Sequence, residues 1–141
     1  MNQDLEKIAS FIEEHHVMSL ATTFAEEISV CSLFYAYEAS TATFVVASSQ
    51  ETTHITHILQ NSQVAGNILL ETKKIGEIKG VQFRGEFTKL DDASLKLLYF
   101  NSFPYALAMR PTLWKISVNF FKLTDNSLGF RNKLIWKSST S

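Results

Sequence analysis

Several absences narrow the class of this protein. Its 141 residues include one cysteine, Cys31, so no internal disulfide can form, and a reducing, cytoplasmic compartment fits the sequence. No apolar run approaches the length of about 18 residues that a membrane helix needs, and the acidic, amphipathic N-terminus is unlike a signal peptide. The net charge is −1 and no basic tract occurs, so we expect no binding to nucleic acid or to a membrane surface.

The sequence patterns of several well-known sites are also missing. Neither a Gly-rich phosphate loop nor a Ser-His-Asp order can be read from the sequence. His54 and His57 stand three positions apart on a predicted helix, and His15 or His16 could complete a metal or haem site with them. Structural metal sites usually draw on cysteine or carboxylate ligands in closer sets, so we predict that no metal is bound.

The pattern of apolar residues predicts a small β-barrel. The chain is 45% hydrophobic and 19% charged, as in a globular protein, and its length predicts one domain over residues 1–141. Strands are predicted at residues 17–24, 28–37, 43–47, 64–70, 78–90 and 114–123, and helices at residues 4–16, 52–60 and 93–100. A doubly wound sheet would need a helix between nearly all strands. We therefore expect a mainly β fold with a few helices, a six-stranded antiparallel barrel.

Finer expectations concern the ends and faces of these elements. Asp4 and Asp91 are the expected caps of the first and third helices. A short helical turn is expected between Pro104 and Pro111, and residues 128–137 should form a turn or hairpin. In the last predicted strand, a period of two predicts one shared face that contains Trp114, Ile116, Val118 and Phe120.

The turn after the third strand gathers hydroxyl groups. Ser48, Ser49, Thr52 and Thr53 lie where that strand ends and the second helix begins. A helix N-terminus presents unpaired backbone N–H groups and a partial positive charge, so hydroxyls beside it can form a phosphate seat. The alternative is that these residues are helix caps and turn formers, which is their commonest use.

Four runs of residues occur in an order that is typical of one superfamily. They are HHVMSLAT, FVVASS, ILQNSQVAGNI and GVQFRGEF. Their order and wording resemble the flavin-binding split-barrel superfamily, to which pyridoxamine 5′-phosphate oxidase belongs. The chain is most similar to its uncharacterised YhbP-like branch, through HVMSLAT, IKGVQFRGEF and TDNSLGF followed by KLIW. The resemblance covers nearly the whole chain and implies the split-barrel fold.

The resemblance also implies a homodimer with two symmetric FMN sites at its interface. The flavin contacts that it implies are Val30, Cys31, Ser32, Leu33 and Tyr35 on the second strand, Ser48 after the third strand, and Thr52, Thr53 and His54 at the helix start. The oxidase has a Ser-Arg-Lys run at the last three positions, so here the hydroxyl is kept and both cations are replaced. Attraction for phosphate would then come from the helix end, from the partly charged histidine, or from another cation. The candidate cations are Lys73, Lys74, Lys79 and Arg84.

Two classes of function follow from the resemblance. The first is an FMN-dependent oxidoreductase acting on an unknown small molecule, in which the flavin carries the redox chemistry. The second is a non-catalytic split-barrel module that has lost productive flavin binding, with a haem- or deazaflavin-binding protein as a further variant. The oxidase holds its substrate phosphate with an Arg-x-His pattern near the C-terminus. Residues 130–133 lack that pattern, so we expect no pyridoxamine-phosphate oxidase activity.

Other side chains have a structural and a functional interpretation. Cys31 is expected to be a buried, inert thiol rather than a nucleophile. Arg84 and Glu86 share a strand face, where they either pair with each other or line the cofactor cleft. Four aromatic residues are expected in the core or at a dimer contact, namely Tyr99, Phe100, Phe103 and Tyr105. The dimer is also expected because Phe120, Phe121 and Trp136 need cover.

Overall fold

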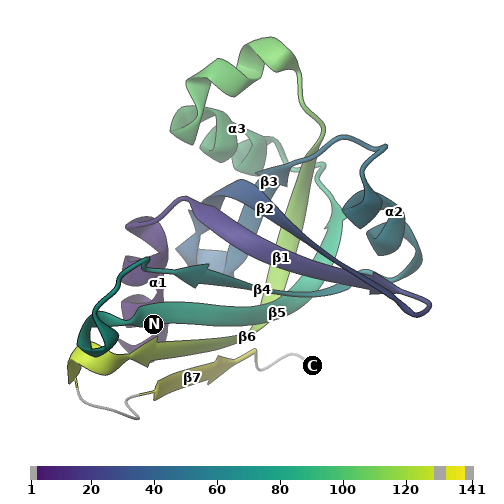
Figure 1. Cartoon of the computed structure of the whole chain (residues 1–141). Helices are drawn as coiled ribbons and strands as arrows, with labels where there is room; N and C mark the ends of the chain where they lie inside the picture. The colour runs from purple at the N-terminus through teal and green to yellow at the C-terminus, as the bar shows by residue number, and fades with distance from the viewer. Residues whose placement is uncertain (1–2, 129–132, 139–141) are drawn as a thin grey trace.

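The computed structural model describes residues 3–128 and 133–138 of the chain, and Figure 1 shows how its elements are arranged. The strands are β1 (Val17–Phe24), β2 (Glu27–Glu38), β3 (Thr43–Ala47), β4 (Gln63–Leu69), β5 (Lys79–Lys89), β6 (Leu113–Asp125) and β7 (Lys133–Lys137). The helices are α1 (Gln3–Glu13), α2 (Thr53–Gln60) and α3 (Ala93–Ser102), and the 3-10 turns are η1 (Ala39–Thr41), η2 (Ile75–Glu77), η3 (Pro104–Met109) and η4 (Asn126–Leu128). Within the described residues, no helix is long and apolar enough to cross a membrane.

Six of the strands close into an antiparallel ring. Neighbouring strands follow the order β3-β2-β1-β4-β5-β6-β7, and β3 also pairs with β6. One edge of β6 is shared, because residues 113–117 pair with β3 and residues 120–124 pair with β7. The expected six-stranded barrel is therefore confirmed, with β7 added outside the ring. The expected turn or hairpin within residues 128–137 includes residues 129–132, which lie outside the described part; β7 pairs with β6, which precedes that range.

Aromatic and branched side chains fill the ring. Phe44, Phe83 and Phe121 are at most 1% exposed, and the ring centres of the first two lie 4.9 Å apart. Burial of a side chain of this size contributes about 1.5–3 kcal/mol. Helix α1 adds Ile8 and Ile12 to the same cluster, whereas α3 covers β2 and β3 through a second, smaller cluster. Figure 1 shows α3 above the barrel and α2 at the end where the β1–β2 hairpin projects.

A bulge in β6 changes the predicted face of one residue. The pairing of β5 with β6 shifts after Arg84, which leaves Asn119 without a counterpart on β5. Such an extra residue reverses the alternation of side chains on one side of it. Phe121 is consequently buried, while Phe120 pairs with the outward-facing Arg84. The prediction that Phe120 shares a face with Trp114 is therefore wrong, because hydrophobic periodicity carries no signal for a bulge.

Two glycines stand where neighbouring strands leave no room for a side chain. A Cβ atom on Gly66 of β4 would lie 2.5 Å from both the Phe83 ring and the carbonyl oxygen of Ser19. At the bulge, a Cβ atom on Gly85 would lie 2.6 Å from the carbonyl oxygen of Ser117. Both distances are shorter than any ordinary van der Waals contact, so the packing requires glycine at both positions.

The helix caps differ from the predicted ones. Asp92, not Asp91, caps α3, because its Oδ1 accepts hydrogen bonds from the backbone N–H groups of Ser94 at 2.8 Å and Leu95 at 3.3 Å. Asp4 lies inside the first turn of α1, which begins one residue earlier. The cap of α3 was predicted one residue too early, and Asp4 was predicted to cap a helix that already includes it; shifts of one or two residues are usual at a helix boundary.

Candidate functional site

Ser48, Thr52 and His54 come together where β3 ends and α2 begins. The Ser48 hydroxyl and Nε2 of His54 are hydrogen-bonded, and the Thr52 hydroxyl lies 3.4 Å from the same nitrogen. The indole N–H of Trp114 donates to the Ser48 carbonyl oxygen at 3.0 Å, which fixes the end of the strand. Thr53, the first residue of α2, is exposed beside them. Three of the four residues predicted around the phosphate thus share one hydrogen-bonded corner.

The Thr52 hydroxyl does not cap α2. Thr52 occupies the N-cap position, but its side chain makes no capping hydrogen bond and instead donates to the Ser49 carbonyl oxygen at 2.9 Å. The helix-cap part of the alternative interpretation is therefore wrong for this hydroxyl, whereas its bond to Ser49 makes Thr52 a turn former. The first N–H groups of the helix donate no hydrogen bond to this hydroxyl. Such free N–H groups favour a negatively charged acceptor.

His54 is a buried residue that orients Ser48. It is 8% exposed, and burial, followed by the charge of His57, lowers its pKa below the ordinary value of 6.5. The imidazole is therefore mostly neutral at pH 7 and cannot replace the lysine charge of the oxidase. Its hydrogen bond to Ser48 instead makes it a positioning residue for that hydroxyl.

An arginine that the sequence did not single out lies beside this corner. A hollow of about 450 Å³ is lined by residues 47–51 and residues 109–112. The backbone N–H of Ser48 donates to the carbonyl oxygen of Thr112 at 3.0 Å and ties the two stretches together. Arg110 belongs to the second stretch and adopts a left-handed conformation, with φ of 46°, at the end of η3.

This hollow has the chemistry of an anion site with one opposing charge. Ser48 and Ser49 supply hydroxyls, and Arg110 supplies a planar guanidinium, which binds phosphate in a bidentate manner. Glu51 also lines the hollow, and because Glu51 and Arg110 are both exposed, water screens both charges. No motif in the sequence marks Arg110, because only the pairing of distant backbone segments brings it to the end of β3.

The four cations proposed from the sequence do not line this hollow. Lys79 forms an ion pair at the start of β5, and Arg84 projects from the outer face of the same strand. Lys73 and Lys74 are exposed in the segment between β4 and η2. Among the described residues, Arg110 is therefore the cation that lines the hollow beside the predicted phosphate corner.

Strand β2 presents its predicted flavin contacts to two opposite faces. Val30 and Ser32 are exposed on the outside of the barrel. The inward-facing members are Cys31, Leu33 and Tyr35, and all three pack in or against the core. The Tyr35 hydroxyl donates to a carbonyl oxygen of α1 at 2.5 Å. A ligand on the outer face can thus touch two of these side chains, and only backbone atoms of the other three.

The thiol of Cys31 fits the structural interpretation. It is half-buried and unpaired, and burial raises its pKa above the ordinary value of 9.0. Because the thiolate is the nucleophilic form, a raised pKa lowers the reactivity of this sulfur at neutral pH.

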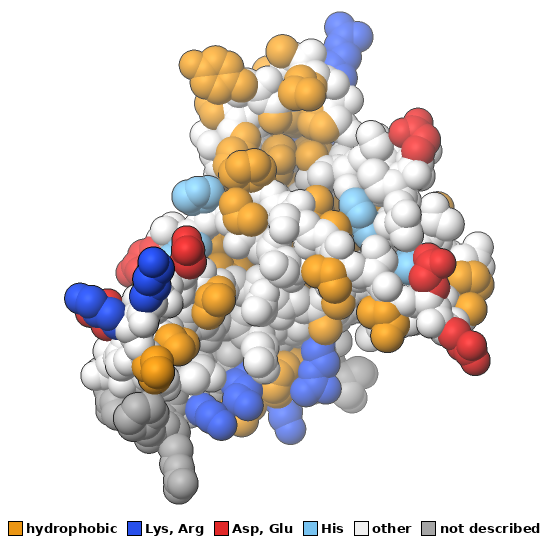
Figure 2. All heavy atoms as spheres, in the orientation of Figure 1, with side chains coloured by type: hydrophobic (Ala, Val, Ile, Leu, Met, Phe, Trp, Pro, Cys, Tyr) orange, Lys and Arg blue, Asp and Glu red, His pale blue; other side chains and the backbone are white. Residues whose placement is uncertain are grey.

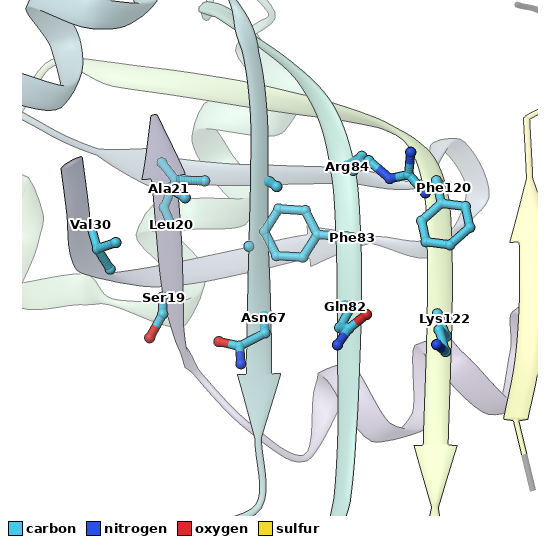
Figure 3. Close-up of a pocket in the computed structure, with 12 residues that line it drawn as sticks. Ser19, Leu20, Ala21, Val30, Asn67, Gln82, Phe83, Arg84, Phe120 and Lys122 are labelled. Atoms are coloured by element: carbon cyan, nitrogen blue, oxygen red, sulfur yellow. The ribbon is translucent and has the colours of Figure 1, made fainter. Parts of the chain in front are cut away.

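A second hollow lies on the outer face of the barrel, next to Val30 (Figure 3). Its volume is about 520 Å³, and strand pairing sets its side chains in two rows across the sheet. One row is polar and contains Ser19, Asn67, Gln82 and Lys122. The next row on this face contains Ala21, Ala65, Arg84 and Phe120, with the two small side chains at the β1 and β4 end. The alanines and Phe120 give this hollow an apolar part, and the polar row with Arg84 borders it, which suits a ligand or a protein surface of mixed polarity.

Arg84 contributes to this hollow rather than to a pair on its own strand. Its guanidinium carbon lies 4.1 Å from the centre of the Phe120 ring, a cation–π contact. Arg84 and Glu86 form no ion pair, although both belong to the described part of the chain. Of the two alternatives left open by the sequence, the geometry therefore favours a place in a cleft.

A second buried histidine, His57, is engaged elsewhere. Its Nδ1 lies 3.0 Å from the Thr22 hydroxyl and its Nε2 lies 2.7 Å from a carboxylate oxygen of Glu27. Both ring nitrogens thus have protein partners. Within residues 3–128 and 133–138, no three histidine, cysteine, aspartate or glutamate side chains gather as metal ligands.

Curated proteins similar to this chain span its whole length. The chain is 33% identical to a UPF0306 protein of Serratia proteamaculans over 95% of both chains. It is 30% identical to the UPF0306 protein YhbP of Escherichia fergusonii, over 98% of this chain and 96% of the other. No family model matches the sequence.

Solved structures share the fold at low sequence identity. A heme binding protein from Mycobacterium smegmatis has a TM-score of 0.78 at 12% identity, over 97% of this chain and 59% of the other. A candidate pyridoxamine 5′-phosphate oxidase from Listeria innocua has a TM-score of 0.70 at 16% identity, over 87% and 98% of the two chains. An FAD-binding protein from Mesorhizobium loti has a TM-score of 0.68 at 17% identity, over 82% and 88%. The fold expected from the sequence is therefore confirmed.

Proposed function

Because the chain belongs to the UPF0306 family and has the split-barrel fold, we propose that it is an FMN-binding oxidoreductase that acts on a small molecule. The observation that carries the proposal is the corner at the end of β3, where Ser48 and Ser49 share a hollow with Arg110. Named proteins of this fold bind FAD or haem, which supports a cofactor on this barrel without selecting one.

In this proposal, the flavin phosphate lies at the N-terminus of α2. The Ser48 hydroxyl, held by His54, donates to a phosphate oxygen, and the first N–H groups of the helix donate to the others. Arg110 supplies the positive charge that Thr53 and His54 no longer provide at the positions of the oxidase clamp. The donor set fits a phosphate because it combines one cation with several N–H and O–H groups.

The flavin ring is proposed to lie along the outer side of β2. Val46 of β3 pairs with Tyr35 of β2, and the antiparallel direction carries the chain beyond β3 toward Ser32. A ligand anchored at Ser48 can therefore extend over Ser32 and Val30, the two outward side chains of this strand. The bound flavin would carry electrons to and from the substrate, while the protein binds it, orients it and excludes water.

We propose that a second copy of the chain completes the site in a cytoplasmic homodimer. On the outer side of β2, Ile28, Val30 and Phe34 are 75%, 69% and 55% exposed. Figure 2 shows further hydrophobic side chains gathered over α3 and η3, where Tyr105 and Met109 are 93% and 82% exposed. Apolar surfaces of this kind are commonly covered by symmetric association. Sedimentation at micromolar concentration should give a dimer. A monomer would rule out a flavin site that is built from two copies of the chain.

Titrations with FMN and riboflavin test the phosphate seat, because only FMN carries a phosphate. Arg110→Ala should weaken FMN about tenfold and leave riboflavin unchanged, since one charge-assisted contact is lost. Lys73→Ala is the matched control, because it removes the same charge from an exposed position outside the hollow. Loss of both ligands to the same extent, or of neither, would reject Arg110 as a phosphate ligand.

The second candidate is a non-catalytic split-barrel module, favoured by the burial and lowered pKa of His54. The absorbance spectrum of freshly purified protein, from the near-ultraviolet to the red, distinguishes flavin, deazaflavin and haem from an empty protein. If the purified protein is colourless and binds neither FMN nor riboflavin, the module replaces the oxidoreductase.

A further inference from the structure

Four basic side chains gather on the outer face of β5, β6 and β7. These four residues, called the basic face below, are Arg84, Lys122, Lys133 and Lys137. Lys122 lies at the centre, because each of the other three is its diagonal neighbour on an adjacent strand, about 7–8 Å away between Cα atoms. Leu134 and Trp136 pack against the core, so the two lysines of β7 face outward.

Acidic side chains do not balance this charge. None of the four cations forms an ion pair with a described residue. Glu86 shares the outer face of β5 but lies beyond Arg84, on the side away from Lys122, and Asp125 is buried and paired with Lys79. Figure 2 shows Lys and Arg side chains along the lower edge of the molecule, with no Asp or Glu of the described residues beside them. Like charges that nothing compensates repel one another, so a bound anion would stabilise this arrangement.

The basic face is too long for a single phosphate group. Lys133 and Lys137 are four residues apart on β7, a distance of about 13 Å at the usual rise of a strand. Arg84 stands in the same row as Lys137 but two strands away, about 10 Å across the sheet. An anion that reaches all four cations must therefore carry several linked negative charges, as a chain of phosphates does.

The hollow on the outer face of the barrel adjoins the basic face (Figure 3). Arg84 and Lys122 line it, together with Phe120 and the side-chain amides of Asn67 and Gln82. Neither amide has a hydrogen-bond partner in the described part of the chain. The guanidinium of Arg84 lies over the half-buried Phe120 ring. Bases stack on surfaces of this kind, and their edges pair with amides.

Other polyanions would use only part of this surface. A phosphate polymer without bases, or a duplex whose bases are stacked inside, would contact the cations and leave the amides unpaired. A membrane needs apolar side chains that stand above the cations. Here Ile135 is 54% exposed, but Phe120 is half-buried beside the hollow. A single strand is the polyanion that presents both its phosphates and its bases.

We propose that the outer face of β4, β5, β6 and β7 binds single-stranded nucleic acid. Its phosphates lie over the basic face, one base stacks on Arg84 and Phe120, and the edge of that base bonds to Asn67 and Gln82. The sequence led us to expect no such binding, because the net charge and the lack of a basic tract do not register cations that only strand pairing brings together. The proposal shares no residue with the FMN phosphate seat and does not rest on it.

Fluorescence anisotropy of the whole protein with a labelled single strand of about 12 nucleotides tests the basic face. Four phosphate contacts predict a slope of about −2.8 for the logarithm of the association constant against that of the salt concentration. Lys122→Gln should make the slope shallower by about 0.7, and a double variant with Lys133→Gln and Lys137→Gln by about 1.4. Lys96→Gln is the control and should leave the slope unchanged, because it removes the same charge from an exposed position on α3.

Phe120→Leu tests the stacking surface, because it keeps an apolar side chain and removes the ring. It should weaken the single strand about tenfold at every salt concentration, with an unchanged slope, and should not affect a duplex of the same length. Circular dichroism checks that each variant is folded, and all of the substituted side chains are at least partly exposed. If Phe120→Leu fails to fold, the lysine variants still decide the proposal.

Several outcomes would overturn the proposal. They are no binding at low salt, an unchanged slope for Lys122→Gln, or a duplex that binds as tightly as the single strand. Tighter binding of ATP would assign the hollow to a free nucleotide, and binding of anionic lipid vesicles without binding of the single strand would assign the basic face to a membrane. Each of these results leaves the FMN and riboflavin titrations of Arg110→Ala to be judged separately, because that variant lies outside the basic face.

Discussion

The Nε2 atom of the buried His57 lies 2.7 Å from a carboxylate oxygen of Glu27, whose side chain is 69% exposed. The other ring nitrogen lies 3.0 Å from the Thr22 hydroxyl. One imidazole thus joins α2 to both strands of the β1–β2 hairpin. The position of α2 depends on this ring, and the first turn of α2 borders the proposed phosphate seat.

Loss of the His57 ring should destabilise the fold. His57→Ala is expected to lower the free energy of unfolding by about 2–4 kcal/mol, because it leaves a cavity and an unpaired Thr22 hydroxyl. Glu27→Gln should lower it by about 1 kcal/mol or less, since that carboxylate is mostly exposed. Urea denaturation measures both, and equal losses would contradict the structural role of the ring.

The close approach at Gly66 gives a second prediction. Gly66→Ala should lower the free energy of unfolding by about 1–3 kcal/mol, because the new methyl group collides with Phe83 and the backbone of Ser19. Gly76→Ala is the control, since nothing lies within 4 Å of a Cβ atom there. A stable Gly66→Ala protein would show that β4 and β5 can separate without cost.

The corrected cap of α3 predicts a pH-dependent difference between two adjacent residues. Hydrogen bonds from the Ser94 hydroxyl and from the N–H groups of Leu95 and Ser94 lower the pKa of Asp92 below 3.8. The stabilisation is therefore complete above pH 3.8 and is lost as the pH falls through the folded-state pKa. Asp92→Ala should lower the thermal midpoint at pH 6 and have little effect near pH 2, whereas Asp91→Ala should have little effect at either pH.

The pKa of His54 also links stability to pH. Burial, and then His57, lower this pKa below 6.5, so the unfolded chain binds more protons than the folded one as the pH falls. The contribution of a neutral His54 is present above pH 6.5 and is lost as the pH falls through the folded-state value. His54→Gln should therefore flatten the loss of stability between pH 7 and pH 5 in chemical denaturation. An unchanged slope would mean that His54 titrates normally.

Pyridoxamine 5′-phosphate should be a poor substrate. The tail lacks the Arg-x-His pattern of the oxidase, although residues 130–132 lie outside the described part of the chain. With FMN added, turnover should stay well below about one per second, the lower end of ordinary enzyme rates. Oxygen consumption measures this turnover, and a rate in the ordinary range would show that other residues hold the substrate phosphate.

Sequence reasoning succeeded where neighbours in the chain decide the structure. The alternation of β5 and the corner of Ser48, Thr52 and His54 both depend on residues close in sequence, and both were predicted. Arg110 was missed because a hydrogen bond between distant segments brings it to the end of β3. The bulge at Asn119 was missed because it depends on how two strands fit together. The neutral state of His54 was missed because the burial of a side chain cannot be read from composition.

The shared edge of β6 bears on how the chain reaches its folded state. The ring closes only when β3, from the first half of the chain, meets the start of β6, from the second half. During synthesis on a ribosome, one edge of β3, which consists of apolar residues, therefore stays unpaired until β6 has emerged. Most other strand pairs in the ring can form before that. Open edges of this kind promote aggregation, and contacts between distant segments form slowly. The yield of soluble protein should thus depend on how soon the closing strand emerges, more than on the stability of the finished barrel.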